Sequence, residues 1–525
     1  MRIAGVVRSL LPRTAKPPSH LYSFRHYSTP STQKLQRQQE FQRLHVDPYP
    51  RFSSHGRPSF LSVQEVFRRW NEIASGEKMQ EAVTIAGRIS SIRESSSKLI
   101  FYDIVQDGHV IQVVASRRSF VGTDEQWQTA IKALNRSDIV SVTGFPGKTK
   151  TGQMSVFVTD RLELLAPCYH DIPTRSLLKE PDKRFRNRHI DLLVNPKSVH
   201  NLRTRAQAIR FVRSYLDQLD FLEVETPVLS PQSGGANARP FSTYANALDM
   251  SMQMRIAPEL YLKQLVIGGI DKVYELGKQF RNEGIDADHN PEFTTCELYM
   301  AYASLEDLIQ MTEDMVSKMV LSITGGLKVG GLDFTPPYRR IDVVEALERK
   351  LGDKLPELER EEAVDPLLNI CHRLHIHVPE PHTIPRLLDK LISHLIEPEC
   401  TQPTFLCHHP VVMSPLAKSA LINGRELSAR FELFVGGKEI VNAYEELNDP
   451  DEQRRRFAKQ LKEREQGDSE APLPDQLFCN ALEYGLPPTG GWGMGMDRMI
   501  AMLAGETHVR EVLAFPTMKP LPSEE

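Results

Sequence analysis

Short runs rich in β-branched and aromatic residues follow one another between residues 81 and 165. They read AVTIAGRISSI, KLIFYDIVQ, VIQVVAS, DIVSVTGFPG and SVFVTDRLELLA, and Gly, Ser, Asn and Asp separate them. Such runs predict β-strands. One helical stretch, DEQWQTAIKAL, falls between the third and fourth runs. Five strands with a helix in that place predict a small Greek-key barrel of the OB type.

A different pattern begins near residue 198. Apolar residues then recur at steps of three and four, which predicts a helix over about 198–219 with one buried face. The residues expected on that face are Leu202, Ala206, Ile209, Val212, Leu216 and Leu219. From there to about residue 520, strands and helices mix without a regular βαβ order. This mixture predicts an α+β domain in which helices flank a largely antiparallel sheet.

The changes of texture divide the chain into five parts. Residues 1–39 predict a mitochondrial transit peptide or a disordered tail, and residues 40–80 a connecting segment with one helix (LSVQEVFRRWNEIA). The barrel is expected over 81–168. Residues 169–197 are rich in Pro and charges and predict a linker, and the α+β domain is expected over 198–520.

Charge is unevenly distributed along the chain. The formal net charge is −4, yet residues 1–39 carry seven Lys or Arg and no acid, so residues 40–525 carry −11. A basic, Ser-containing, acid-free N-terminus is typical of an organelle transit peptide, and RHYS (25–28) is similar to a mitochondrial processing site. We therefore expect the mitochondrial matrix; a disordered basic tail is the alternative.

Two classes of protein are disfavoured by composition. No apolar run approaches the ~20 residues of a membrane helix, so membrane insertion is not expected. The six Cys show neither a disulfide framework nor a CxxC pair, which predicts free thiols rather than a structural zinc site.

Residues 272–303 hold the most informative candidate chemistry. Two alternating runs flank the polar loop NEGIDADHN, which predicts a strand, a loop and a strand. Arg281 and Glu283 share one side of the first run with Gly277 and Gln279, and Phe293, Glu297 and Tyr299 share one face of the second. An Arg suits a phosphate or carboxylate, an aromatic face suits a stacked base, and paired acids suit an ammonium ion. The segment therefore predicts a polar ligand pocket.

This segment resembles motif 2 of the class II aminoacyl-tRNA synthetases, and more narrowly the lysyl-tRNA synthetases of subclass IIb, mitochondrial type. FLEVETPVL (221–229), within about 205–229, resembles motif 1, and GWGMGMDRM (491–499), within about 490–515, resembles motif 3. The lysine-specific stretches also match: SGGANARPF, RIAPELYLK, CELYMAYA, SPLAK and ARFELFVGGKEIVNAYEELNDP. The resemblance runs from about residue 80 to 520. It implies ATP-dependent ligation of L-lysine to tRNA(Lys) through a lysyl-adenylate, for mitochondrial translation, by a homodimer joined through motif 1.

The resemblance also implies roles for individual residues. It assigns catalysis to Arg281 and Arg498. It assigns ATP binding to Arg281, Glu283, His289, Asn290, Phe293 and Arg498, and Mg²⁺ binding to Glu432 and Glu439. It assigns the α-amino end of lysine to Gly235, Glu259 and Asn442, and the ε-ammonium to Glu297, Tyr299 and Glu446.

In the barrel, the resemblance implies an anticodon-binding face. The residues near the family's contact positions are Arg93, Phe101, Tyr102, Gln112 and Gln153. Phe101 and Tyr102 are alternatives, and Gln153 stands where the family often has Glu. The basic segment 179–188 is a second candidate for contact with tRNA, because a chain near −11 needs local positive groups to bind a polyanion.

Two other functions remain open at this point. A relative that lysylates a protein side chain would share the catalytic motifs, but such relatives generally lack the barrel. A catalytically silent RNA-binding protein would keep the barrel without the intact Arg and Glu residues of the motifs.

Overall fold

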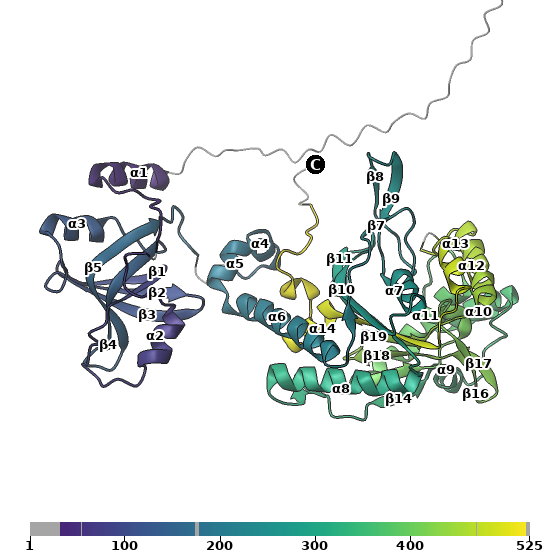
Figure 1. Ribbon diagram of the computed structural model, residues 1–525. Helices are drawn as coiled ribbons and strands as arrows, with labels where there is room; N and C mark the ends of the chain where they lie inside the picture. Colours follow the sequence, from purple (N-terminus) through teal and green to yellow (C-terminus); the bar gives the residue numbers. More distant parts are fainter. Residues whose placement is uncertain (1–31, 54, 174–177, 469, 521–525) are drawn as a thin grey trace, which may run out of the picture. The chain divides into compact units, whose positions relative to one another are not determined.

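The computed structural model describes residues 32–53, 55–173, 178–468 and 470–520 (Figure 1). The chain forms two compact units, Met1–Leu177 and Leu178–Glu525. The predicted targeting segment lies outside the described residues up to residue 31. Within the described ranges, no helix has both the length and the apolar character needed to cross a membrane. All six cysteines are free thiols.

The first unit is built on a closed five-stranded barrel in the order β1-β2-β3-β5-β4. Its strands are β1 (Val83–Ser96), β2 (Leu99–Gln106), β3 (His109–Ser116), β4 (Ile139–Lys148) and β5 (Met154–Ala166). Helix α3 (Asp124–Lys132) lies between β3 and β4 in the chain. It begins with a capping box in which the side chains of Thr123 and Gln126 each accept the other's backbone N–H. The predicted OB-type barrel is confirmed.

The barrel unit begins earlier than the sequence predicted. Helix α1 (Thr32–Leu44) buries Phe41, and helix α2 (Val63–Trp70) buries Val66 and Trp70, all in the same apolar core as the barrel strands. The expectation that 1–39 is entirely leader or disordered tail is therefore wrong for 32–39. Residues 40–80 are likewise part of this unit rather than a connecting segment, because their apolar side chains complete its core.

A buried ion pair joins α1 to the barrel. Arg37 Nη2 lies 2.6 Å from Asp138 Oδ2, and the two side chains are 5% and 0% exposed. Asp138 also accepts the backbone N–H groups of Asn135 and Cys168, each at 2.7 Å. The Asp138 carboxylate thus ties its own loop to two segments that are distant in sequence, around Arg37 and Cys168.

The predicted linker is largely helical. Helices α4 (Pro181–Arg186) and α5 (Arg188–Val194) belong to the second unit. Arg184 binds Asp191 and Glu511, both at 2.8 Å, and Arg188 is 1% exposed and lies 2.5 Å from Asp191. Two of the basic residues that we expected to contact tRNA, Arg184 and Arg188, are therefore already neutralised inside the protein. Of that segment, Lys183 and Arg186 are exposed.

The second unit is organised around an eight-stranded sheet in the order β14-β15-β18-β19-β20-β11-β10-β6. The pairs β14–β15 and β10–β6 are parallel, and the others are antiparallel. This confirms an α+β domain on a largely antiparallel sheet. The strands are β6 (Leu222–Glu223), β10 (Lys272–Phe280), β11 (Glu292–Ala301), β14 (Arg339–Asp342), β15 (Thr404–Cys407), β18 (Arg430–Val435), β19 (Lys438–Glu445) and β20 (Thr489–Gly495).

Helices α6 (Pro196–Asp217), α8 (Leu305–Thr324) and α14 (Met496–Leu503) share one apolar core with this sheet. The predicted face of α6 is partly wrong. Val212 and Leu216 are buried as expected, but Ala206 and Leu219 are exposed. The buried face instead includes Asn201, Thr204 and Ala208. Small and polar residues occupy it because α6 packs closely there and Asn201 donates to Glu506 at 2.8 Å.

A second core, which includes residues of β10 and β11, contains α7 (Glu259–Ile267) and α13 (Gln476–Leu482). A third holds α9 (Val343–Leu351), α10 (Val364–Arg373) and α11 (Ile384–Leu395). The remaining elements are α12 (Pro450–Glu465), β7 (Leu229–Ser230), β8 (Ser242–Ala245), β9 (Met250–Met254), β12 (Lys328–Val329), β13 (Leu332–Asp333), β16 (Ser419–Ile422) and β17 (Arg425–Ser428).

Replacing Asp138 by Ala should destabilise the barrel unit by about 3 kcal/mol, because the change leaves the buried Arg37 guanidinium without its counter-charge. Calorimetry on the full chain would follow the unfolding transition of this unit. The matched control is Glu40→Ala, which removes an exposed pair on the same helix at 4.0 Å and should cost less than ~0.5 kcal/mol. Equal effects of the two substitutions would contradict the role given to Asp138.

Candidate active site

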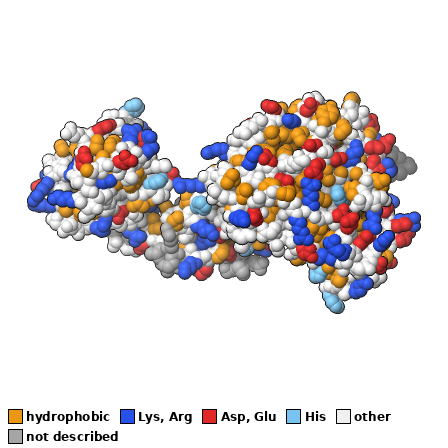
Figure 2. All heavy atoms as spheres, turned by 90° about the horizontal axis from the view of Figure 1, so that it is seen from below, with side chains coloured by type: hydrophobic (Ala, Val, Ile, Leu, Met, Phe, Trp, Pro, Cys, Tyr) orange, Lys and Arg blue, Asp and Glu red, His pale blue; other side chains and the backbone are white. Residues whose placement is uncertain are grey.

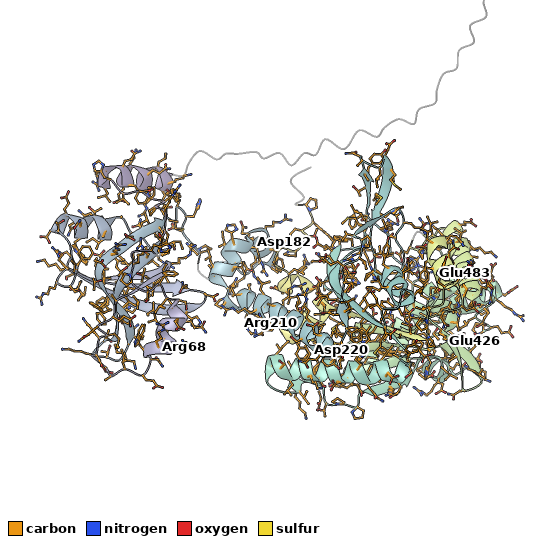
Figure 3. All side chains as sticks on the ribbon, in the orientation of Figure 1. Arg68, Asp182, Arg210, Asp220, Glu426 and Glu483 are labelled. Atoms are coloured by element: carbon orange, nitrogen blue, oxygen red, sulfur yellow. The ribbon has the colours of Figure 1, made fainter. Side chains whose placement is uncertain are left out.

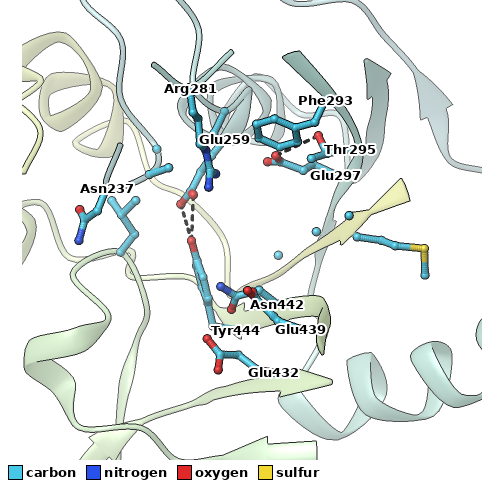
Figure 4. A pocket seen from close by; sticks show the side chains of 18 of the residues that line it. Asn237, Glu259, Arg281, Phe293, Thr295, Glu297, Glu432, Glu439, Asn442 and Tyr444 are labelled. Atoms are coloured by element: carbon cyan, nitrogen blue, oxygen red, sulfur yellow. Dashed lines mark hydrogen bonds between the residues drawn. The ribbon is translucent and has the colours of Figure 1, made fainter. Parts of the chain in front are cut away.

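A cavity of about 550 Å³ lies on the large sheet of the second unit (Figure 4). Its floor is one row of residues that runs across four strands. Glu432 on β18 pairs with Asn442 on β19, which pairs with Gly493 on β20, which pairs with Glu297 on β11. Residues directly opposite one another in neighbouring strands share a face. The sheet register therefore brings three predicted site residues, far apart in sequence, into one line.

The strand in the middle of this floor is built from glycines. Gly491, Gly493 and Gly495 alternate along β20 and line the cavity. A Cβ on Gly491 would overlap Glu446 Oε1 and lie 2.8 Å from Tyr299 Cε1. Glycine is required there because side chains from neighbouring segments occupy the space above its Cα.

Arg281 and Phe293 form one end of the cavity. They face each other at the ends of the strand–loop–strand formed by β10 and β11, and the Arg281 guanidinium carbon lies 5.1 Å from the centre of the Phe293 ring. The buried Arg281 Nε has no hydrogen-bond partner among the described residues. A cation beside an aromatic plate, with a donor still to be satisfied, suits a nucleotide phosphate together with its base.

His289, Arg498 and Glu439 form a hydrogen-bonded chain at the same end. Arg498 Nη2 lies 3.1 Å from His289 Nε2, and Arg498 Nη1 lies 3.4 Å from Glu439 Oε2. His289 Nδ1 lies 2.9 Å from Asp286. Arg498 comes from α14 and His289 from the loop after β10, so the sheet and the helix bring together the two residues predicted to hold phosphates.

Two other residues predicted to bind ATP also line the cavity. Glu283 is exposed on the loop between β10 and β11. Asn290 is 8% exposed, and its amide already bonds the backbone: its nitrogen donates to Glu292 O at 2.7 Å, and its oxygen accepts the Thr517 N–H at 3.3 Å. The structure thus gives Asn290 a role in holding the loop, and its direct contact with ATP stays a prediction.

Carboxylates gather in the same cavity, where Figure 4 shows Glu259 and Glu297. Tyr299 also lines the cavity, and Gly235 lies beside Glu259. The Tyr444 hydroxyl lies 2.9 Å from both Glu259 oxygens, and Thr295 Oγ1 donates to Glu297 at 3.4 Å. Burial, and then the charge of Glu259, raises the pKa of Glu297 to about 8. This part of the cavity is therefore poised to accept a cation.

Gly235 allows the loop before this part of the cavity to approach closely. Its φ of +87° is a conformation that favours glycine, and a Cβ there would lie 2.9 Å from Glu259 Cβ. A larger residue would push the loop away from the carboxylate.

Glu446 lies one layer behind the cavity wall, in contrast to the other residues predicted to bind lysine. Its side chain is 0% exposed and forms an ion pair with Lys263, which is also 0% exposed. Glu446 Oε1 has no hydrogen-bond partner among the described residues and occupies the place that a Cβ on Gly491 would take, near Tyr299. The predicted direct contact of Glu446 with an ammonium therefore remains a prediction, and the partner that the structure provides is Lys263.

Glu432 and Glu439 stand on neighbouring strands and line the cavity, but their pKa values shift in opposite directions. Glu432 lies 2.5 Å from Arg430 Nη2 and 3.2 Å from His409 Nε2. Burial opposes ionisation, yet these two groups lower the pKa of Glu432 to about 2. Burial and repulsion by Glu432 raise the pKa of Glu439. A positive ion between the two carboxylates would relieve that repulsion.

Sequence reasoning missed several residues that shape the site. Arg430 binds both Glu432 and Asn442 Oδ1, the latter at 3.1 Å. Asp497 accepts from Arg205 at 2.6 Å and from the Thr294 N–H at 3.1 Å, and so ties α6 and β11 to α14. Lys263 could have been noticed, because it follows Glu259 by four residues, the spacing of an ion pair on one face of a helix. No sequence pattern marked the partners of Arg430 and Asp497.

In the barrel, the structure decides between two aromatic candidates. Tyr102 is 1% exposed in the barrel core, where burial raises its pKa, so its prediction as an anticodon contact is wrong. Phe101 is half-buried on the opposite face and is paired with Arg93 on β1. Gln112 is only 5% exposed. Its amide nitrogen donates to Gln153 at 3.2 Å, so these two predicted contacts are neighbours.

Comparison with known proteins agrees with this geometry. Residues 180–519 match the family model for class II tRNA synthetases (D, K and N), and residues 83–165 match that for the OB-fold nucleic acid binding domain. The lysine–tRNA ligase cla4 of Cladosporium cladosporioides is 45% identical over 492 residues, which cover 90% of this chain and 81% of that protein. The chain belongs to the class II lysine–tRNA ligases.

Other relatives of this ligase family differ in their stated compartment. A probable cytoplasmic lysine–tRNA ligase of Encephalitozoon cuniculi is 45% identical over 475 residues, 87% of this chain and 92% of that protein. The mitochondrial lysine–tRNA ligase of Schizosaccharomyces pombe is 41% identical over 498 residues, 92% of this chain and 93% of that protein. Membership of the family therefore leaves the compartment open.

Gly491→Ala should reduce amino-acid-dependent ATP–pyrophosphate exchange about 100-fold, because the added Cβ displaces Glu446 and Tyr299 from the wall of the site. Gly326→Ala is the control: a Cβ there would have nothing within 4 Å, and Gly326 does not line the cavity. We expect the control to retain activity within about 3-fold. If Gly491→Ala exchanges as fast as the control, the close packing around Gly491 is not needed for catalysis.

Proposed function

We propose that the chain activates L-lysine with ATP and transfers it to tRNA(Lys), releasing AMP and diphosphate. The observation that carries this proposal is the polarity of a single cavity. It brings Arg281, Phe293 and Arg498 together with the buried acid Glu259 and the half-buried acid Glu297. A nucleotide fits the first group, and an amino acid with two ammonium groups fits the acids.

The first step joins two anions. A lysine carboxylate oxygen attacks the α-phosphorus of ATP, the bond to the bridging oxygen breaks, and diphosphate leaves with that electron pair. Arg281 reduces the repulsion between the reacting groups because its guanidinium contacts both of them. The carboxylate is already ionised, so no general base is required, and positioning by Arg281, Phe293 and Arg498 supplies much of the acceleration.

The acidic part of the cavity accounts for the choice of amino acid. Glu259 and Asn442, beside Gly235, accept the α-ammonium, and Glu297 with the Tyr299 hydroxyl accepts the ε-ammonium. A neutral side chain would leave Glu297 buried without a cation, which should disfavour it by about 10⁴. Ornithine is shorter by one methylene and is the harder competitor, since that difference is worth ~1–3 kcal/mol.

Glu432 and Glu439 fit the Mg²⁺ that the family uses with ATP. Among the residues described, no three His, Cys, Asp or Glu side chains form a metal cluster. Two carboxylates are nevertheless the protein share that Mg²⁺ often takes, the other ligands being phosphate oxygens and water. When bound, Mg²⁺ supplies charge neutralisation at the phosphates. The repulsion between Glu432 and Glu439 is consistent with such a cation.

Transfer to tRNA is the second step, in which the terminal 3′-hydroxyl of tRNA attacks the adenylate carbonyl and AMP leaves. Anticodon recognition falls to the outer face of the barrel, where Phe101 offers a plate for base stacking beside Arg93. Gln153 offers an amide there, and the buried Gln112 holds it through a hydrogen bond. Basic and acidic side chains are intermixed on the face shown in Figure 2. Contacts with phosphates there would therefore come from local groups.

Phe101→Ala should raise the KM for tRNA in charging assays without changing pyrophosphate exchange.

The chain acts as a homodimer through residues 205–229. Four apolar side chains of this segment, Leu219, Leu222, Val228 and Leu229, are 38–50% exposed. Exposed apolar groups close together mark an interaction surface. Charged residues of the same segment, such as Arg210 and Asp220 (Figure 3), would form its polar rim.

Sedimentation equilibrium should give twice the mass of one chain, and Leu222→Glu should lower the measured mass.

Residues 1–31 direct the chain to the mitochondrial matrix. The support is their basic, acid-free composition, together with the similarity of the chain to the mitochondrial ligase of S. pombe. A fluorescent fusion of residues 1–40 should enter mitochondria, and a diffuse cytosolic signal would contradict this proposal.

Exchange of labelled pyrophosphate into ATP tests the function itself. Among the amino acids, lysine should support the fastest exchange, and the lysine-dependent rate should fall at least ~1000-fold in Arg281→Ala, because the cation at the reacting phosphate is lost. Arg136→Ala, an exposed barrel residue, is the control and should leave the exchange unchanged. Absence of lysine-dependent exchange in the wild type would exclude an amino-acid-activating enzyme. Exchange without charging of tRNA transcripts would favour lysylation of a protein.

The KM for lysine should fall as the pH rises from 6 to 8 and then level off. Below pH 8 the Glu297 carboxyl is increasingly protonated, since its pKa is about 8, and the ammonium must displace that proton in order to bind. The change should be about 10-fold per pH unit at most. Glu297→Gln should weaken lysine binding and remove this dependence, while the KM for ATP stays similar. A wild-type KM for lysine that is flat across this range would show that Glu297 does not receive the ammonium.

A further inference from the structure

Lys263 is a buried cation that no step described above uses. It lies on α7 with its side chain 0% exposed. Burial opposes its charge, but Glu259 and Glu446 outweigh that effect and raise the pKa of Lys263 above its usual value. The chain therefore keeps a charged lysine of its own beside the site proposed for a free lysine.

This ammonium joins two carboxylates that belong to different ends of the ligand. Lys263 Nζ lies 2.6 Å from Glu259 Oε1 and also pairs with Glu446 Oε2. Glu259 lines the cavity at the proposed α-amino end, and Glu446 Oε1 lies against the Gly491 Cα beside Tyr299, at the proposed ε-ammonium end. One internal cation thus holds both groups, so the position of one depends on the position of the other.

The remaining contacts of Lys263 are apolar or aromatic. Its Nζ lies 5.5 Å from the Phe478 ring centre and 5.9 Å from that of Tyr444. Without Lys263, the carboxylates of Glu259 and Glu446 would repel each other in a dry environment, and each would move or take up a proton. If Lys263 only stabilised α7 through its i,i+4 pair with Glu259, its second ion pair, with Glu446 in the loop after β19, would not be needed.

We propose that Lys263 is a positioning residue that sets the distance between the two ammonium sites of the lysine pocket and thereby helps the enzyme select lysine over ornithine. It touches neither substrate nor the reacting atoms. Its effect passes through Glu259 and Glu446, which it fixes relative to each other. This inference rests on the proposed function, because it assigns the two ends of the pocket to lysine.

Kinetics of pyrophosphate exchange with lysine and with ornithine test the proposal. Lys263→Met keeps the length of the side chain and removes its charge. The KM for lysine should rise about 10-fold or more, the KM for ATP should change less than about 2-fold, and the lysine-to-ornithine ratio of kcat/KM should fall at least about 5-fold. The matched control is Lys318→Met, since Lys318 also pairs with an acid four residues earlier on a helix but is exposed. It should behave as wild type.

A double variant keeps the test decisive if Lys263→Met does not fold. Lys263→Met with Glu446→Gln removes one buried charge of each sign, a change that proteins often tolerate. Its preference for lysine over ornithine should fall as in the single variant. In the cycle of single and double variants, the combined loss in kcat/KM for lysine should be smaller than the product of the two single losses.

The outcomes separate the two hypotheses. Wild-type protein without lysine-dependent exchange would overturn the proposed function. Wild-type exchange combined with an unchanged lysine-to-ornithine ratio in the folded Lys263 variants would overturn the role of Lys263 alone. If the losses in kcat/KM for lysine of the two single variants multiply in the double variant, Lys263 does not act through Glu446. That result would also overturn the role of Lys263.

Discussion

Mutual repulsion among carboxylates in and directly behind one cavity is the constraint on which this site depends. Glu259, Glu297 and Glu446 are brought together where little water screens them, and burial raises the pKa of Glu297 and of Glu446. One internal cation, Lys263, offsets part of this charge. The remainder is left for a ligand, so the same electrostatic imbalance that weakens the empty site favours a diamino acid in it.

The large sheet makes this arrangement possible. Its central strand β20 carries glycines where the neighbouring strands carry functional side chains, so the floor stays open while Glu432, Asn442 and Glu297 stand in register. The cores beneath the sheet hold these strands rigidly, and Asp497 links α6, β11 and α14. Catalysis by positioning needs such rigidity, because small displacements of Arg281 or Arg498 would weaken the contact with the phosphates.

In the barrel, the face of the strand on which a residue lies decides whether that residue is available for binding. Buried and partly exposed residues alternate along β2, so the neighbours Phe101 and Tyr102 lie on different faces, one on the outer face and one in the core. A register uncertain by one residue therefore exchanged a stacking candidate for a core residue. The helices before the barrel, α1 and α2, complete the same core, and the Arg37–Asp138 pair fixes the first of them.

The sequence by itself determined the OB-type barrel with the order of its strands and helix, the α+β class and the motifs around Arg281, Glu297 and Arg498. These depend on local periodicity and on residue types at fixed spacing. The sequence misplaced the start of the barrel unit, described α4 and α5 as a linker, and offered Arg184 and Arg188 for tRNA although they bind Asp191 and Glu511. Only the tertiary structure decided those points, and it also revealed Lys263 between Glu259 and Glu446. Pairings across hundreds of residues, and the burial that gives a charge its strength, have no local pattern from which they could be predicted.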